Sequence, residues 1–319
     1  MANTNNPATM WNCPNYVGEL FLVGAFRTPF LNMIGGLAGG GISTIQSMQF
    51  PLVSPWTLES ASQPAISETT SLTAPTAWTY VRGVDYNTCQ IFQKAVSMSY
   101  VSLSTSGVVV ADATTGLATL GTQPVQDQFA FQKNAALKQI AIDVEYTFLQ
   151  GAYQQATSAA VAAKTRGIVT ACTTSTVSAA SGYLTKKLFD QLVRTMAGNG
   201  AEFNNAVCFV NAYQKQMLSN LYGYAPEDRN VGGVNIKQIE TDFAMVGIVW
   251  DPFMPVDKLL IADMTFCQPV FNPVPGKGVL FYEDLSKVGA SEKGQIYGHI
   301  GLNYGAEEMH GTITDLLYT

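Results

Sequence analysis

The chain has 319 residues, of which 47% are hydrophobic and 11% aromatic, so disorder over its whole length is excluded. Only 13% are charged, about half the roughly 25% of a typical soluble domain. The net charge of −6 does not fit a protein that binds DNA by neutralising phosphates. Such sparse charge predicts that uncharged polar side chains or neighbouring molecules cover much of the surface.

The five cysteines are odd in number and include no C-x-x-C pair. They therefore predict free thiols in a protein that is assembled in a reducing compartment. No basic stretch followed by an apolar one opens the chain, and no run approaches 18 consecutive apolar residues. We accordingly expect neither a signal peptide nor a membrane span, and no membrane partner.

The first hundred residues are rich in Ser, Thr, Pro and Gly, which predicts an extended region. An apolar segment at residues 19–30 ends at Thr28 and Pro29, because proline forces its predecessor out of helical geometry. The glycine cluster between residues 35 and 41 favours a hinge over a phosphate-binding loop, since a downstream acidic residue and a strand-to-helix context are missing.

Residues 50–103 predict a long hairpin with two strand-like arms, residues 54–60 and 87–103. Between the arms lies a stretch rich in Ser, Thr, Pro and Ala that includes Pro64 and Pro75. This composition predicts a loose tip that is able to flex.

A helix is predicted from Pro124 to Gly151, with an Ala-rich continuation to Ala163. At about 1.5 Å per residue the first part would be about 40 Å long. Its main apolar stripe consists of Phe129, Ala136, Leu137, Ile140, Ala141, Val144 and Phe148. Phe131, Ile142 and Leu149 fall on the opposite side, and a helix with two apolar faces must be covered twice.

The rest of the chain predicts short helices and strands in an α+β arrangement. Thr185 is expected to cap a helix through Met196, and Asn211 is expected to cap another that ends before Gly223. Strands are expected at residues 206–210, 234–239, 245–250, 258–264, 279–282, 295–303 and 311–316.

Motifs for catalysis are missing: the chain has no G-x-S-x-G sequence, and Gly276 to Gly278 lack the spacing of a P-loop. His299 and His310, with two glutamates between them, make a metal site conceivable, but the spacing favours structural or exposed histidines. Asp143 and Glu145 on the long helix are interpreted as solvated or interface charges. We therefore expect no catalytic residue, no cofactor and no metal.

Three segments resemble a known family. They are Thr28-Pro29-Phe30 before the glycine cluster, residues 87–95 (NTCQIFQKA), and the carboxyl end at residues 301–305 and 310–316. The segments, and the order of extended arm, hairpin, long helix and α+β region, resemble major capsid proteins of tailed bacteriophages with the Hong Kong 97-type fold. Within that superfamily the resemblance is to the SU-ten-like branch, from about residue 19 onward.

The resemblance implies an α+β Hong Kong 97-type capsid fold with a spine helix from residue 124 to about residue 160. Its parts would be residues 1–49 as the N-terminal arm, 50–103 as the E-loop, 104–164 as the peripheral domain, 165–265 as the axial domain and 266–319 as strands that return to the peripheral domain.

The implied function is structural: copies of the chain would assemble as hexamers and pentamers into an icosahedral or prolate shell around double-stranded DNA. The shell would be assembled in the host cytoplasm and belong to the virion, with portal, scaffold and decoration proteins as partners. The candidate assembly residues are Thr28, Pro29, Phe30, Pro64, Pro75, Gln90, Phe92, Phe131, Ile142 and Leu149.

Two alternatives remain open at this point: an encapsulin-like nanocompartment shell with the same fold, and a soluble hydrolase with a titratable cleft. Some relatives form covalent cross-links between a lysine and an asparagine beside a carboxylate. Lys94 is the only lysine in residues 50–103 and lies near the hairpin base, so we expect no such cross-links here.

Overall fold

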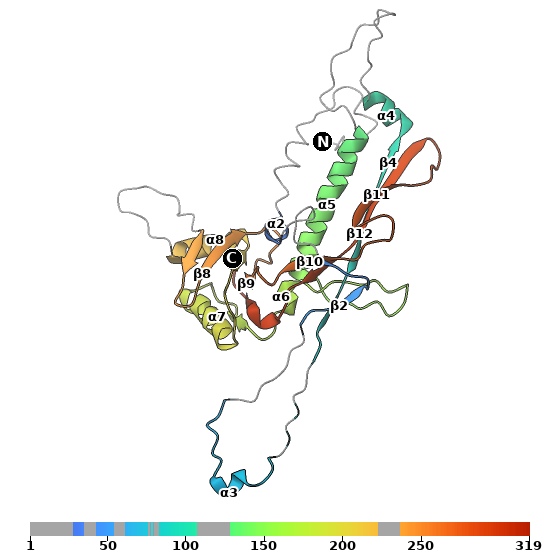
Figure 1. Ribbon diagram of the computed structural model, residues 1–319. Coiled ribbons are helices and arrows are strands. Elements are labelled where there is room, and N and C mark those ends of the chain that lie inside the picture. Colours follow the sequence, from blue (N-terminus) through green and yellow to red (C-terminus); the bar gives the residue numbers. More distant parts are fainter. Residues whose placement is uncertain are drawn as a thin grey trace, which may run out of the picture.

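The computed structural model describes residues 28–34, 43–53, 61–75, 77, 79, 83–106, 128–222 and 237–319. Two β-sheets and the long helix α5 (Gln128–Gln150) form the body, and a hairpin projects from it (Figure 1). The predicted α+β class is confirmed. No helix in the described ranges is long and apolar enough to cross a membrane.

The first sheet lies beside α5, and β12 (Ser291–Asn303) is its central strand (Figure 1). One edge of β12 pairs with β4 along that strand, from Ser99 opposite Ser291 to Gln90 opposite Ile300. The other strands are β1 (Ser43–Thr44), β10 (Gln268–Phe271), β11 (Leu280–Asp284) and β4 (Gln90–Ser99). Buried and exposed residues alternate along β4, because one face of the sheet packs into the main core with α5.

The second sheet has six strands in the order β5, β13, β9, β6, β8, β7. Their bounds are Thr176–Ser178, Gly311–Thr314, Leu259–Asp263, Ala206–Val210, Met245–Trp250 and Gln238–Glu240. Helices α7 (Lys186–Gly198) and α8 (Ala212–Tyr222) pack on one face of it. The strand β6 is buried throughout because its other face, with Val207 and Phe209, belongs to the core around α5.

The cap of α7 is confirmed: the Thr185 hydroxyl accepts a hydrogen bond from the backbone N–H of Leu188 at 3.3 Å. Leu192, Val193 and Met196 are buried, as their helical spacing predicts. The short elements α2 (Pro29–Met33), α6 (Ile168–Ala171) and the 3₁₀ turn η2 (Glu307–Met309) were not expected from the sequence.

The long helix ends at Gln150, so the predicted continuation to Ala163 is wrong; its predicted start at Pro124 lies outside the described residues. The chain turns back at Gly151, whose carbonyl oxygen accepts the N–H of Gly167 at 2.8 Å. A Cβ atom on Gly151 would lie 2.5 Å from the carbonyl oxygens of Thr147 and Thr165. Only glycine therefore fits where the returning backbone crosses the helix end.

Both apolar faces of α5 are covered over its second half. Ile140, Val144 and Phe148 of the main stripe are buried, whereas Leu137 is exposed. On the opposite side Leu149 is 0% exposed and Ile142 is 7% exposed. The expected second cover of the helix is therefore supplied at these two residues by the chain itself.

The hairpin begins where β2 (Gln49–Pro51) pairs antiparallel with β3 (Tyr86–Thr88), and its tip carries the short helix α3 (Glu68–Ser71). Residues 54–60, the predicted first arm, lie outside the described residues. The predicted second arm is wrong beyond Thr88, because β4 belongs to the first sheet and α4 (Tyr100–Ser106) is helical. The Ser99 hydroxyl accepts the N–H of Ser102 at 3.2 Å and so caps α4.

The last strand also departs from the prediction for residues 266–319. Strands β10, β11 and β12 lie in the first sheet, but β13 pairs with β5 and β9 in the second. The carboxyl end of the chain therefore finishes in the six-stranded sheet and joins the two halves of the body.

Candidate functional site

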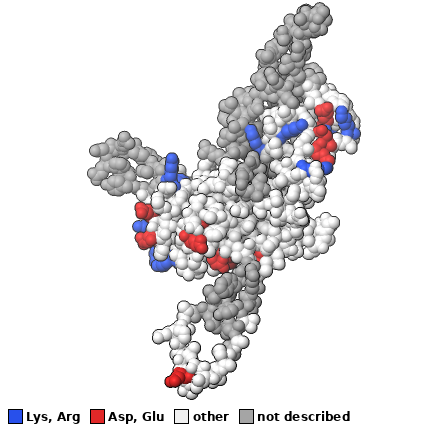
Figure 2. Space-filling view, in the orientation of Figure 1, with Lys and Arg blue, Asp and Glu red and all other residues white. Residues whose placement is uncertain are grey.

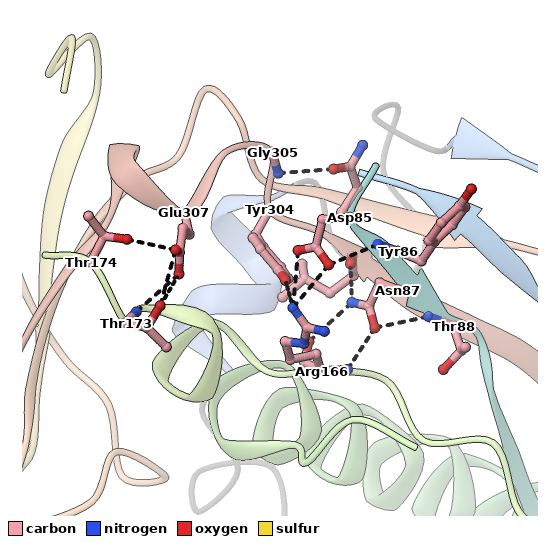
Figure 3. A network of polar contacts seen from close by, with 12 residues as sticks. Asp85, Tyr86, Asn87, Thr88, Arg166, Thr173, Thr174, Tyr304, Gly305 and Glu307 are labelled. Atoms are coloured by element: carbon pink, nitrogen blue, oxygen red, sulfur yellow. Dashed lines mark hydrogen bonds and ion pairs between the residues drawn. The ribbon is translucent and has the colours of Figure 1, made fainter. Parts of the chain in front are cut away.

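The base of the hairpin is fixed to the body by a cluster of polar residues, which we call the hairpin-base cluster: Asp85, Asn87, Thr88, Arg166 and Tyr304 (Figure 3). The Arg166 Nη1 atom donates to Asp85 Oδ2 at 3.1 Å and to the Tyr304 hydroxyl at 3.1 Å. Its guanidinium also lies over the Tyr153 ring, 4.8 Å from the centroid. Burial raises the pKa of Tyr304 to about 12, so the phenol stays neutral beside Arg166.

Asn87 is the most heavily bonded member of this cluster and is 0% exposed. Its Nδ2 group donates to the carbonyl oxygens of Arg166 at 3.2 Å and of Leu302 at 2.8 Å. Its Oδ1 atom accepts the N–H groups of Thr88 at 2.9 Å and of Arg166 at 2.8 Å. All four hydrogen-bonding positions of the amide are used, which fixes β3 to the loop after α5 and to the end of β12.

A second contact in Figure 3 fixes the turn η2. The Glu307 carboxylate accepts the N–H of Thr173 at 3.1 Å and the hydroxyl of Thr174 at 2.7 Å. Together with the hairpin-base cluster, it holds three chain segments that are far apart in sequence in one rigid arrangement.

The tip of the hairpin has the opposite character. Every residue from 61 to 75 is exposed, including Pro64 and Pro75, and Leu72 and Ile66 are 84% and 70% exposed. Among the described residues, local bonds shape α3: the Ser67 hydroxyl accepts the N–H of Thr70 at 3.1 Å. The tip thus presents two large apolar side chains to solvent at the far end of the projection in Figure 1.

Half of the other predicted assembly residues are buried inside the chain. Phe30 is 0% exposed and Phe92 is 5% exposed, both in the main core. They are core residues of a single chain, as Ile142 and Leu149 are, so their expected availability for assembly is corrected. Those that remain partly exposed are Thr28, Pro29, Gln90 and Phe131.

The interpretation of Glu145 as a solvated charge is wrong, because its side chain is 0% exposed. Its Oε1 and Oε2 atoms accept the N–H groups of Phe30 at 2.8 Å and of Leu31 at 2.7 Å. The partners lie more than a hundred residues away in sequence, so local spacing could not reveal this contact.

The two histidines are not brought together. His310 is buried, where its Nδ1 accepts the N–H of Asp263 at 3.2 Å and its Nε2 lies 2.6 Å from the carbonyl oxygen of Tyr304. His299 Nε2 lies 2.8 Å from the Tyr297 hydroxyl. In the part of the chain that the structure describes, no three His, Cys, Asp or Glu side chains form a group that could hold a metal ion.

A groove of about 500 Å³ lies between β4 and α5. Lys94 and Asp143 form an ion pair at 2.8 Å on its wall, and Tyr146 and Phe253 also line it. Lys94 lies on β4, a strand of the body, rather than on the hairpin. That the chain forms no covalent cross-links stays a prediction.

A strut helix beside one sheet, a second sheet and a projecting hairpin together form the Hong Kong 97-type fold. Solved structures share this fold. The capsid asymmetric unit of cyanophage A-1(L) is 12% identical with a TM-score of 0.61, and the alignment covers 91% of this chain and 93% of that one. The capsid of the native GTA particle is 13% identical with a TM-score of 0.57, covering 91% of each chain.

An encapsulin has the same fold: the holo-SrpI complex from Synechococcus elongatus PCC 7942 is 9% identical with a TM-score of 0.52, covering 87% of this chain and 85% of that one. No curated protein sequence matches the chain. The sequence matches the SU10 major capsid protein family over residues 2–317, so the chain belongs to that family. It is a structural protein of the virion, forms the shell of a phage from many copies of itself, and is not an enzyme. Family membership favours the phage shell over the nanocompartment and the hydrolase.

Proposed function

We propose that the hairpin tip binds a neighbouring copy in the shell, while the hairpin-base cluster fixes the direction in which the tip points. Copies joined in this way form hexamers and pentamers that close into an icosahedral or prolate shell around double-stranded DNA. Portal and scaffold proteins, and decoration proteins on the outside, complete the set of partners.

One observation carries this proposal: every residue from 61 to 75 is exposed, although the segment includes Ile66 and Leu72. Large apolar side chains at such a position gain about 1.5 to 3 kcal/mol each when a partner covers them. Repeated around a closed assembly, this gain favours association over the free subunit.

The charge distribution supports contact between like copies. In Figure 2 most of the Lys, Arg, Asp and Glu side chains lie toward two ends of the visible face, a few acidic ones lie along its lower edge and at the hairpin tip, and much of the remaining described surface is uncharged. Residues 61–75 carry a single charged residue, Glu68. A segment with one charge that meets an uncharged surface keeps the cost of removing charges from water small. The net charge of −6 also disfavours adhesion of the shell to packaged DNA.

Deletion of residues 62–73 tests the proposal. Because these residues are exposed, the variant should fold normally but remain as soluble subunits in a sedimentation velocity experiment. Replacement of the same residues by an equal length of Gly and Ser separates the loss of side chains from the shortening of the hairpin. Intact shells from both variants would refute the proposed role of the tip.

A further inference from the structure

The strand β4 forms one edge of the first sheet. It pairs with β12 on one side, and in the described residues no strand lies on its other side, which we call the free edge. An edge strand presents a row of backbone N–H and C=O groups that can pair with another chain, and proteins commonly protect it with charges, proline or a cover. The register of the ladder shows which residues of β4 form this row.

Tyr100 fixes the phase of the ladder between β4 and β12. Its N–H donates to the carbonyl oxygen of Ala290 at 3.1 Å, next to the opposed pair Ser99 and Ser291, so Tyr100 and Ala290 form a hydrogen-bonded pair. In an antiparallel ladder such pairs alternate with pairs that do not bond. The even-numbered residues from 90 to 98 therefore turn their backbone groups toward β12, and the odd-numbered residues turn theirs to the free edge.

The other edge of β12 gives the same phase. The N–H of Leu285 donates to the carbonyl oxygen of Lys293 at 2.9 Å, so Lys293 turns its backbone toward the side of β11 and away from Ser97, its opposite residue on β4. None of the residues in the outward row is charged or a proline, so their side chains do not protect the edge. The row consists of Ile91, Gln93, Ala95 and Ser97, all of them exposed.

A groove accompanies the free edge. It is the groove of about 500 Å³ between β4 and α5, lined by residues 90–94 on one side and by Ile142 and Tyr146 on the other. Phe92 lies in the core with α5, so the even-numbered side chains of β4 are on the helix side of the sheet. A strand added to the free edge would lie about 4.8 Å from β4, and every second side chain of that strand would face the groove.

Residues 61–66 of the hairpin tip, with the sequence Ala-Ser-Gln-Pro-Ala-Ile, have the properties of such a strand. They are exposed, carry no charge and belong to no helix or strand of the subunit. Pro64 has no N–H, and proline fits an edge strand only where this position faces away from the ladder. Gln63 and Ala65 must therefore be the residues that bond, and Pro64 and Ile66 then share the other face.

The groove decides the direction of the added strand. In an antiparallel pair, bonded residues have their side chains on the same face, so Gln63 and Ala65 would join the exposed face of β4 and Ile66 would face the groove. A parallel strand with the same bonds would turn Ile66 to the opposite face of the sheet. Only the antiparallel direction buries this apolar side chain against α5.

We propose that residues 61–66 of one copy add to the free edge of β4 in a neighbouring copy as an antiparallel strand, with Ala65 opposite Gln93. This register places Ile66 opposite Phe92, in the middle of the groove wall. Main-chain bonds then provide affinity, and the groove provides specificity for the apolar side chain. The inference rests on the proposed binding of the tip to a neighbour and names the surface that receives it.

The receiving strand belongs to another copy because of the shape of the subunit. In Figure 1 the hairpin with α3 projects downward from its base, whereas β4 runs upward from the same place. Only Cys89 separates the end of β3 from the start of β4, and the hairpin-base cluster fixes this junction. The tip of a chain therefore points away from its own β4.

Hydrogen–deuterium exchange with residue resolution tests the strand addition on β4. Shells of the unmodified chain are compared with subunits that lack residues 62–73. The amides of Gln93 and Ala95 should exchange at least about tenfold more slowly in the shells. The amides of Phe92 and Lys94, which face β12, should be protected in both samples and serve as the internal reference.

The tip in the same shells should show the alternation of a bonded strand. The amides of Gln63 and Ala65 should be protected, whereas those of Ser62 and Ile66, which point away from β4, should exchange at least about tenfold faster. Simple covering of the tip by a neighbour would protect all four amides alike.

Two proline variants test the bonds themselves. Ala65→Pro removes an N–H that bonds to β4, whereas the control Ser62→Pro removes an N–H that points away from it. Neither change breaks a bond inside the subunit, because no hydrogen bond joins residues 61–66 to the described part of their own chain. In sedimentation velocity, Ala65→Pro should remain as subunits and Ser62→Pro should form shells.

Two results would overturn the strand addition: unprotected amides of Gln93 and Ala95 in shells, or shells from Ala65→Pro in the same yield as from Ser62→Pro. Either result leaves the proposed function standing as long as deletion of residues 62–73 abolishes shells. Shells from the deleted chain would instead refute the proposed function, and the strand addition with it.

Discussion

The tip and the base of one hairpin differ completely in how their side chains are used. At the base, Asn87 is fully buried and makes four hydrogen bonds within its own chain. At the tip, Leu72 is 84% exposed and no residue from 61 to 75 is buried. The base is therefore held by bonds inside the subunit, and the tip is the exposed region that we propose binds a neighbouring copy.

The amino-acid composition does not distinguish the tip of the hairpin from its base. Both regions contain few charged residues and several small polar ones. What distinguishes the base is that its partners, Arg166, Leu302 and Tyr304, come from segments distant in sequence. Folding thus stabilises one end of the hairpin, and we expect assembly to stabilise the other.

The largest effect on stability is expected for Asn87→Ala. The substitution leaves two carbonyl oxygens and two N–H groups without their partner in a buried place, which should cost about 3 kcal/mol in the free energy of unfolding. Urea unfolding of subunits that lack residues 62–73 measures this without a contribution from assembly. Gln93→Ala, on the exposed face of β4, is the control and should cost less than about 0.5 kcal/mol. Equal losses for the two variants would show that the base is not the rigid part.

A smaller, pH-dependent effect on the free energy of unfolding is expected from His310, whose Nε2 lies 2.6 Å from the carbonyl oxygen of Tyr304 in the hairpin-base cluster. Burial lowers its pKa below the ordinary 6.5, so the folded chain binds fewer protons there than the unfolded chain once the pH falls below 6.5. Stability from this residue is therefore complete above about pH 6.5 and declines by up to about 1.4 kcal/mol per pH unit below it.

Urea unfolding of subunits between pH 5 and pH 7.5, for the unmodified chain and for His310→Gln, measures this pH dependence of the free energy of unfolding. The difference between the two curves cancels the carboxyl groups that both contain. A difference that does not change with pH would contradict the assignment of a neutral, buried His310.

Local signals predicted much of the body. The Thr185 cap, the apolar run at residues 206–210 and the strand at residues 245–250 agree with α7, β6 and β8, because neighbours in sequence decide these elements. The partner of β4 was missed, since alternation shows that a strand has a buried face but not which strand lies beside it. For the same reason Phe92 was expected in the hairpin, whereas it lies in the main core.

The candidate site was harder to predict for the same reason. Pro64 and Pro75 marked the exposed tip correctly, because turn residues act locally. The roles of Asn87 and Glu145 were missed, because a buried polar residue is recognised mainly by partners that the fold brings from far away. A polar residue inside an otherwise apolar helix face was the one available hint for Glu145.

Sedimentation velocity of the double variant Ile66→Ser, Leu72→Ser tests the central claim most directly, because it changes two exposed side chains and leaves the backbone intact. The control Ile66→Val, Leu72→Met keeps both positions apolar. We predict that the control sediments as shells, while the serine variant sediments as subunits whose urea unfolding matches that of the tip-deleted chain within about 0.5 kcal/mol. Shells of normal size and yield from the serine variant would contradict the account.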